Sequence, residues 1–334
     1  MTDADKPLHV IPQLEAVANL KANPAAYWRS TVGRVNNGHL RTWIAPKVLL
    51  GPDDPVYAIG SCFALELEKA LLGRGHKVLS ALSPDDPFLI RAYLARYNVP
   101  SMAREFERCL VDPCPMRDED LAVALPDGSY RDGHYYALDR LRNMNALSNK
   151  RAAARKSFRR IREAKVVILT LGLNEVWYDP DAGAYLNTCV DLDLISAKPR
   201  LEVHVLSAAQ NVRHLEAIRD LIRTHIPHPV QIIVSVSPVA LSATFSMDDV
   251  VVANMRSKSI LRAAAEEFCA RHDDVHYFPS YEISMCSDLR ETFQQDGRHV
   301  KPTMAQHIIR TFNAVHMGGL GMDAVEEAPL AATG

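Results

Sequence analysis

The feature that most constrains this chain is a short apolar run that ends abruptly at a Gly-Ser pair. Residues 56–63 read Val-Tyr-Ala-Ile-Gly-Ser-Cys-Phe, and apolar residues then recur at helical spacing. This pattern predicts a buried strand that enters a helix through a tight turn, with the helix ending at Gly73 or Gly75. Ser61 would lie where unpaired backbone N–H groups stabilise negative charge. The position suits a nucleophile, although an ordinary N-cap serine has the same pattern.

A second apolar run, at 166–171, is followed by Gly172 and then Asn174. Its β-branched residues predict another buried strand, with Asn174 at its carboxyl end. An asparagine amide can donate a hydrogen bond to an oxyanion, a contribution of about 3–4 kcal/mol in hydrolases. Asparagine is also common in turns, so a structural role is the alternative.

Near the C-terminus, Asp296 and His299 are separated by three positions in a segment of turn-forming residues. In a compact turn the carboxylate would orient the imidazole, and the imidazole could accept a proton from a hydroxyl. Ordinary surface pairs have the same spacing. The functional interpretation therefore depends on the two earlier segments.

In this order and spacing, the three segments resemble the SGNH hydrolases. More narrowly, residues 60–64 read Gly-Ser-Cys-Phe-Ala, the motif that names the GSCFA-domain family. The resemblance extends over about residues 45–315 and includes further similar segments at 170–177, 236–239, 254–258 and 277–283.

This resemblance implies a role for each matched residue. Ser61 is the expected nucleophile, His299 the base and Asp296 the residue that orients the base. The backbone N–H of Ser61, together with Gly172 and Asn174, is expected to contact the oxyanion.

Two departures from the wider superfamily matter. Glu175 follows Asn174 where the superfamily has Asp. The superfamily also has a glycine in the second of its sequence motifs, and no glycine lies between Gly75 and Gly128 to match it. One oxyanion donor is therefore unassigned. Weaker candidates for substrate binding are Glu175, Ser237, Asn254 and Lys258. Glu175 could also position the oxyanion loop or pair with a nearby cation, and helix-capping or surface roles are the alternatives for Asn254 and Lys258.

Strands that alternate with helices predict a three-layer α/β/α sandwich with a flavodoxin-like parallel sheet. Sites in such folds lie at the carboxyl ends of strands, where Ser61, Asn174 and Ser237 all fall. We expect further strands at 76–79, 230–236 and 275–278, and helices at 149–164, 207–225, 253–271 and 303–315.

The chain divides by composition into an extension, a main domain and a tail. Residues 1–50 are expected to form an irregular N-terminal extension, 51–320 the catalytic domain and 321–334 a disordered tail. Six prolines within 81–147 indicate an inserted cap without a long helix. Aromatic residues expected to anchor the extension are Tyr27, Trp28 and Trp43.

Composition indicates an ordinary globular protein. The chain has 334 residues, 48% hydrophobic and 23% charged, and its net charge of −2 gives no general attraction to nucleic acid or anionic membrane. No apolar stretch is long enough to span a membrane, and the N-terminus lacks signal-peptide features. The six cysteines form no Cys-x-x-Cys pair, which favours reduced thiols and a cytoplasmic location.

Other residues have functional alternatives. Cys62 would also be activated at a helix N-terminus and could replace Ser61 as the nucleophile. His225 and His228 have a metal-like spacing, but neighbouring prolines and the absence of cysteine partners argue against zinc. A basic helix could bind nucleic acid, although a solvated face is the simpler interpretation; its arginines are Arg151, Arg155, Arg159 and Arg162.

The sequence thus predicts serine-dependent acyl transfer or ester hydrolysis through an acyl-enzyme. An O-acylated carbohydrate is the expected substrate, because relatives in this broad class act on acylated glycans. No metal or cofactor is expected, apart from an acyl-coenzyme donor if the protein is a transferase. The alternative is a non-catalytic module that binds a carbohydrate or nucleotide, which the missing glycine favours.

Overall fold

The structure is a computed structural model that describes residues 7–45, 47, 49–51, 53–82, 94–135, 140–187 and 191–316. Its centre is a parallel sheet built from β3 (Val56–Gly60), β6 (Val166–Leu171), β10 (Gln231–Val236) and β11 (Val275–Tyr277). The strands lie in the order β11-β10-β6-β3. These four strands confirm those predicted from the sequence.

Beside β3, Val78 forms a single parallel bridge with Val56, so the strand expected at 76–79 is reduced to one bridge. With this segment included, the strand order across the sheet is that of flavodoxin-like folds. The chain leaves β3 toward Val78 on one side and later returns to form β6 on the other. Ligands in such sheets bind where the order reverses, which here lies between the carboxyl ends of β3 and β6.

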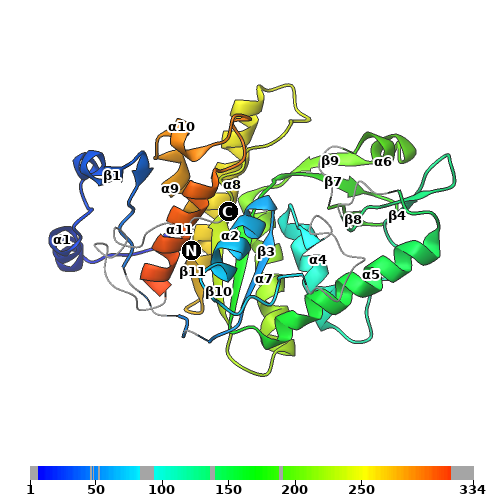
Figure 1. Ribbon diagram of the computed structural model, residues 1–334, viewed down its shortest axis with the longest axis horizontal. Helices are drawn as coiled ribbons and strands as arrows, with labels where there is room; N and C mark the ends of the chain where they lie inside the picture. Colours follow the sequence, from blue (N-terminus) through cyan, green and yellow to red (C-terminus); the bar gives the residue numbers. More distant parts are fainter. Residues whose placement is uncertain are drawn as a thin grey trace.

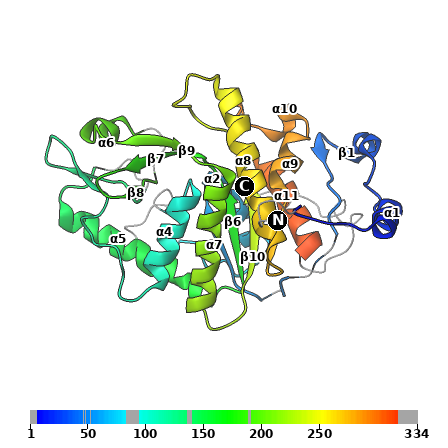
Figure 2. The same ribbon diagram turned by 180° about the vertical axis from the view of Figure 1, so that it is seen from behind.

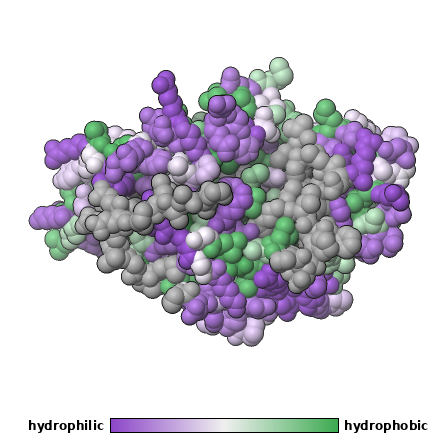
Figure 3. Space-filling model, viewed as in Figure 1, coloured by the Kyte–Doolittle hydropathy of each residue, from purple (hydrophilic) through white to green (hydrophobic). Residues whose placement is uncertain are grey.

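Helices cover both faces of this sheet and complete the three predicted layers (Figures 1 and 2). One face carries α2 (Cys62–Leu72), α9 (Ser280–Met285) and α11 (Pro302–His316). The other carries α4 (Val99–Leu110), α7 (Ala208–His225) and α8 (Val250–Ala270). Among the residues coloured by hydropathy in Figure 3, hydrophilic ones predominate, and a group of apolar residues lies near the centre of this face.

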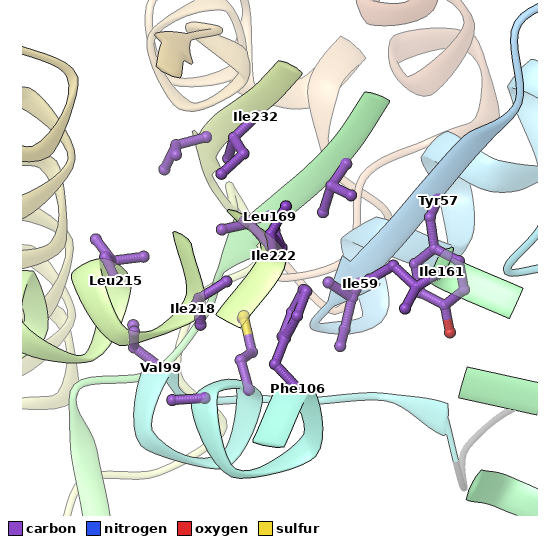
Figure 4. Packing of buried hydrophobic residues seen from close by; sticks show 14 of the residues in the cluster. Tyr57, Ile59, Val99, Phe106, Ile161, Leu169, Leu215, Ile218, Ile222 and Ile232 are labelled. Atoms are coloured by element: carbon purple, nitrogen blue, oxygen red, sulfur yellow. The ribbon is translucent and has the colours of Figure 1, made fainter. Parts of the chain in front are cut away.

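The core follows the alternation of side chains along each strand. Tyr57 and Ile59 of β3 point toward α4 and α7, whereas Val56 and Ala58 point toward α2 and α11. Figure 4 shows Ile59 and neighbouring strand residues packed against Phe106 of α4. Because both faces of the sheet are buried, its strands are continuous apolar runs that were readable in the sequence.

The Pro-rich segment 81–147 contains a twelve-residue helix, α4, so the expectation of no long helix there was wrong. Pro100 lies in the first turn of α4, where its missing N–H is not needed. Asn98 caps the helix by accepting a hydrogen bond from the backbone of Ser101. Proline is disfavoured only in the interior of a helix, and the next proline, Pro113, lies beyond the end of α4.

A second insertion, which the sequence did not reveal, follows β6. It forms a small antiparallel sheet of β7 (Glu175–Asp179), β8 (Ala184–Tyr185) and β9 (Glu202–Val205), with α6 (Leu192–Ala197) nearby. It shares a small core with a hairpin from the first insertion, formed by β4 (Ala122–Ala124) and β5 (Tyr130–Asp132). Strands this short have too few residues to show a period.

The N-terminal extension has regular structure, contrary to expectation. It contains α1 (Gln13–Ala22), η2 (Trp28–Arg34), β1 (Val35–Asn36) and β2 (His39–Leu40). Tyr27 is 53% exposed and Trp28 is 81% exposed, so neither anchors the extension to the domain. Leu40 of β2, in contrast, is buried. The expected tail at 321–334 lies outside the described residues.

The predicted basic helix is α5 (Met144–Phe158), continued by η3 (Arg159–Glu163). Its arginines do not form a solvated face. Arg155 and Arg159 bind Asp112 with distances of 2.7 Å and 2.6 Å, and Arg151 is fully buried against Asp132 at 2.8 Å. The arginine stripe therefore holds the end of α4 and the β5 hairpin in place.

Buried charges attach α4 to the segment beside β3. Arg96 and His134 both contact Oε2 of Glu105 at 2.7 Å, and all three side chains are buried. Burial alone would raise the pKa of Glu105, but the Arg96 and His134 contacts outweigh it and lower that pKa to about 2. The backbone N–H of Arg96 donates to the carbonyl of Gly60 at 2.7 Å, so this cluster positions one wall beside Ser61.

Replacing Glu105 with Gln should lower the free energy of unfolding by about 3–5 kcal/mol, because the substitution removes the buried carboxylate charge that contacts Arg96 and His134. Urea titration followed by circular dichroism measures this loss. Glu107→Gln, at an exposed position of the same helix, is the matched control and should change stability by less than about 0.5 kcal/mol. Equal effects of the two substitutions would contradict a stabilising role for the cluster.

Candidate active site

Ser61 lies at the turn between β3 and α2, as the sequence predicted. It is the N-cap of α2, it is 6% exposed, and its Oγ accepts a hydrogen bond from the backbone of Phe63 at 3.4 Å. Gly60 before it has a φ of +147°, and a Cβ there would lie 2.1 Å from Oγ1 of Thr170. Only glycine permits this close approach of β3 to β6.

Gly172 brings the end of β6 against Ser61. A Cβ added to Gly172 would lie 2.9 Å from Cβ of Ser61 and 2.7 Å from the carbonyl oxygen of Tyr97. Leu173 donates its backbone N–H to the same carbonyl at 2.7 Å. Three backbone segments thus meet at the switch point of the sheet, and the structure brings Ser61 and Gly172 together.

Asn174 is fully buried, and its side chain contacts protein groups. Its Nδ2 donates to the carbonyl of Leu206 at 2.8 Å, and its Oδ1 accepts from Asn211 at 2.7 Å. These bonds fix the turn from β6 into β7. An oxyanion contact by Asn174 remains a prediction. Asn211 was missed in the sequence, although a polar residue beside the apolar stripe of α7 was a readable signal.

Asp296 and His299 form the close pair that their spacing predicts. Nδ1 of His299 lies 2.5 Å from Oδ2 of Asp296, and the His299 backbone donates to Oδ1 at 3.1 Å. The hydrogen bond from His299 lowers the pKa of Asp296 well below its usual range. Arg298 between them contacts the carbonyl of Ala240, beyond the end of β10, so this loop lies at the carboxyl edge of the sheet.

Within the described residues, no hydrogen bond joins His299 to Ser61. The relay from Asp296 through His299 to Ser61 therefore remains a prediction. Both side chains of the acid–imidazole pair are partly exposed, with 44% and 40% of their surfaces accessible.

Glu175 holds a loop that follows β10. Its carboxylate accepts hydrogen bonds from Oγ1 of Thr244 at 2.8 Å and from the backbone of Phe245 at 2.9 Å. Arg256 of α8 contacts the same carboxylate at 3.2 Å. The pair with Arg256 is the structural alternative expected for Glu175, and a contact with the oxyanion loop or a substrate stays a prediction.

Ser237 and Asn254 also bind backbone groups of that region. Oγ of Ser237 accepts from the backbone of Val239 at 3.3 Å, and Oδ1 of Asn254 accepts from Leu241 at 3.1 Å. Both side chains stabilise the chain after β10. Their contact with a substrate stays a prediction.

Lys258 of α8 is fully buried beside the nucleophile turn. Its Nζ donates to the carbonyl of Gly172 at 2.9 Å, and no carboxylate of the described residues forms an ion pair with it. Burial, with a smaller effect of Arg298, lowers the pKa of Lys258 to about 7. This amine connects α8 to the end of β6 and lies within the electrostatic reach of the loop that carries His299.

A cavity of about 160 Å³ opens beside Ser61. Cys62, the alternative nucleophile, is half-buried at this cavity, and its Sγ lies 3.8 Å from the hydroxyl of Tyr97. The structure thus presents both a hydroxyl and a thiol at one turn.

Fold and site together define a parallel α/β protein with a candidate nucleophile at the switch point of its sheet. Residues 55–312 match the model of the GSCFA family, and the chain belongs to this family. No curated protein matches the sequence. A solved carbohydrate acetylesterase family member from Sinorhizobium meliloti is similar, with 12% identity over 78% of this chain and 95% of its own and a TM-score of 0.30. These values are too low to transfer an activity.

Among the helices of the described residues, none has the length and apolar character needed to cross a membrane. The five cysteines among the described residues are free thiols, and Cys189 lies outside the described residues.

Replacing Gly172 with Ala should lower kcat by about a hundredfold or more, because the new methyl group would force the end of β6 away from Ser61. Steady-state hydrolysis of p-nitrophenyl acetate measures the loss, and a thermal melt checks folding. Gly33→Ala is the matched control, since a Cβ there meets no atom within 4 Å. Full activity of the Gly172 variant would show that this contact is not required.

Lys258 should make stability depend on pH. Its pKa is lower in the folded state than the usual 10.5, so above about pH 7 the unfolded chain binds more protons and stability rises with pH. Relative to Lys258→Met, the wild-type free energy of unfolding should rise by up to about 1.4 kcal/mol per pH unit between about pH 7 and 9. Denaturant titrations measure the difference, with the exposed Lys156→Met as the control. If this difference in the free energy of unfolding did not change with pH, the pKa of Lys258 would be the same in the folded and unfolded states.

Proposed function

We propose that this protein is a serine-dependent acyl hydrolase or acyltransferase that forms an acyl-enzyme on Ser61. The observation that carries the proposal is the contact between Ser61 and Gly172 at the switch point of the sheet. The paired Asp296 and His299 lie at the same edge, on a loop held beyond β10. A hydroxyl, an imidazole and a carboxylate at one edge are the parts that acyl transfer needs.

In the proposed reaction, His299 removes the proton from the Ser61 hydroxyl as Oγ attacks the carbonyl carbon of an ester or thioester. Asp296 keeps the imidazole oriented through Nδ1, which leaves Nε2 for the proton. Collapse of the tetrahedral intermediate breaks the bond to the leaving oxygen or sulfur, which takes the proton from His299. Water or an acceptor hydroxyl then attacks the acyl-enzyme, and its proton passes back through His299 to Ser61.

The oxyanion would be stabilised by backbone N–H groups near Ser61 and Gly172, at the N-terminus of α2. The Lys258 contact with the Gly172 carbonyl supports this assignment, because it restrains that peptide against α8. A loop that closes over the substrate would shorten the distance from His299 to Ser61, since catalytic hydrogen bonds are often long before substrate binds.

We propose an O-acylated carbohydrate as the substrate, following the resemblance to SGNH hydrolases, and a cytoplasmic location. An acyl-coenzyme donor would serve the transferase reaction. The alternative is a carbohydrate- or nucleotide-binding module at the same crevice. It is favoured by the Asn174 amide, whose described contacts are to protein groups rather than to an open site.

Ser61→Ala should abolish covalent labelling by a fluorophosphonate probe and lower kcat on p-nitrophenyl acetate by about a thousandfold or more. Mass spectrometry of the labelled protein locates the modified residue. Cys62→Ala is the matched control and should keep both labelling and turnover, because the thiol is not the proposed nucleophile.

Labelling at Cys62 would exchange the roles of the two neighbours. Wild-type protein that is inert to the probe and to activated esters, yet binds a sugar or nucleotide, would support the binding module instead.

A further inference from the structure

The cavity beside Ser61 runs along the open edge of β3. Beyond the Val56–Val78 bridge, no strand of the described residues pairs with this edge. The segment that carries Leu94 and Tyr97 covers it instead, together with α2 and the end of α5. The cavity holds about 160 Å³, and Ser61 is among the residues that line it.

Its lining is apolar. Side chains of Tyr57, Ile59, Leu65, Leu94 and Phe158 line it, with the small Ala58, Ala64 and Ala95 leaving the space. Most of these residues are buried, whereas Cys62, Leu65 and Ala95 are half-exposed.

The polar groups of the wall are turned to the protein. Ser80 donates its hydroxyl hydrogen to Glu68 at 2.6 Å and accepts from the backbone of Ala58 at 3.2 Å. The hydroxyl of Tyr97 lies against Sγ of Cys62. A guest in this cavity therefore gains little from hydrogen bonds and much from leaving water.

The size of the cavity selects the guest. In other proteins, an apolar cavity of about 150 Å³ stays free of water and binds benzene, a molecule of six carbons. A space of about 160 Å³ beside Ser61 is therefore far larger than the methyl group of an acetyl ester requires. Leaving it mostly empty would forfeit the contacts of its lining.

We propose that this cavity receives the hydrocarbon tail of the acyl group bound to Ser61, and that the protein favours acyl groups of about six carbons over acetyl. The inference rests on the proposed function and adds its substrate class. The tail would enter past Cys62 and Leu65 while the carbonyl carbon stays at Ser61. The alcohol or acceptor would then approach from the opposite side, where the loop of Asp296 and His299 lies.

A series of p-nitrophenyl esters from acetate to dodecanoate tests the proposal on the full chain. For the wild type, kcat/KM should rise about fourfold per added methylene up to about six carbons and then level or fall. Ala64→Leu fills the cavity and should reduce the hexanoate-to-acetate ratio of kcat/KM at least about tenfold. Ala217→Leu, the same change at an exposed position of α7, should keep the wild-type ratio.

Leu65→Ala enlarges the half-exposed end and should move the optimum to longer esters, which decides the matter if the Ala64 variant does not fold. A thermal melt of each variant monitors folding. Equal kcat/KM across the series, or equal ratios in the Ala64 and Ala217 variants, would overturn the acyl-tail assignment while leaving Ser61 catalysis intact.

Failure of the proposed function has a different signature. The wild type would then hydrolyse no ester of the series, and alkyl fluorophosphonates of any chain length would leave Ser61 unmodified. Probe labelling that accelerates with chain length in the wild type, but not in the Ala64 variant, would support the cavity assignment independently of turnover.

Discussion

The close approach of two strand ends is the constraint on which the rest of the structure depends. Gly60 and Gly172 both occupy positions where a Cβ would collide with neighbouring atoms, so β3 and β6 reach the edge of the sheet almost in contact. This contact aligns the start of α2 with the turn after β6. Ser61 is thereby held by backbone on both sides rather than by its own side-chain contacts, and a rigid backbone is what a preorganised nucleophile requires.

Buried charges support this edge from outside the sheet. The Arg96–Glu105 pair positions the segment whose backbone binds Gly60, and Lys258 restrains the carbonyl of Gly172 from α8. Such buried groups cost desolvation and add little net stability compared with apolar packing. Their value here is positional, because each one connects a helix to a backbone group of the nucleophile turn.

The sequence predicted the parts of the fold whose physics is local. Buried parallel strands such as β3 and β6 are unbroken apolar runs, and Ser61 and the Asp296–His299 pair follow from turn chemistry within a few residues. The contacts of Asn174 could not be read from local patterns: Leu206 follows an insertion with strands too short to show a period, and Asn211 reaches Asn174 from α7 through tertiary packing. The helix α4, which contains Pro100 in its first turn, was not predicted, because a proline is as compatible with the start of a helix as with its interruption.

The outer edge of β3 explains how the acyl-binding side of Ser61 could vary while the side that faces β6 stays fixed. Among the described residues, the outer edge of β3 forms one bridge, between Val56 and Val78, and side chains line the cavity along this edge. Those side chains can vary in size without changing strand register, whereas the β6 side is limited by backbone contacts at Gly172. The outer edge of β3 would therefore determine which acyl groups bind, and the contact between β3 and β6 would determine the catalytic geometry. Small residues such as Ala58 and Ala64 would then set the space available to the acyl group.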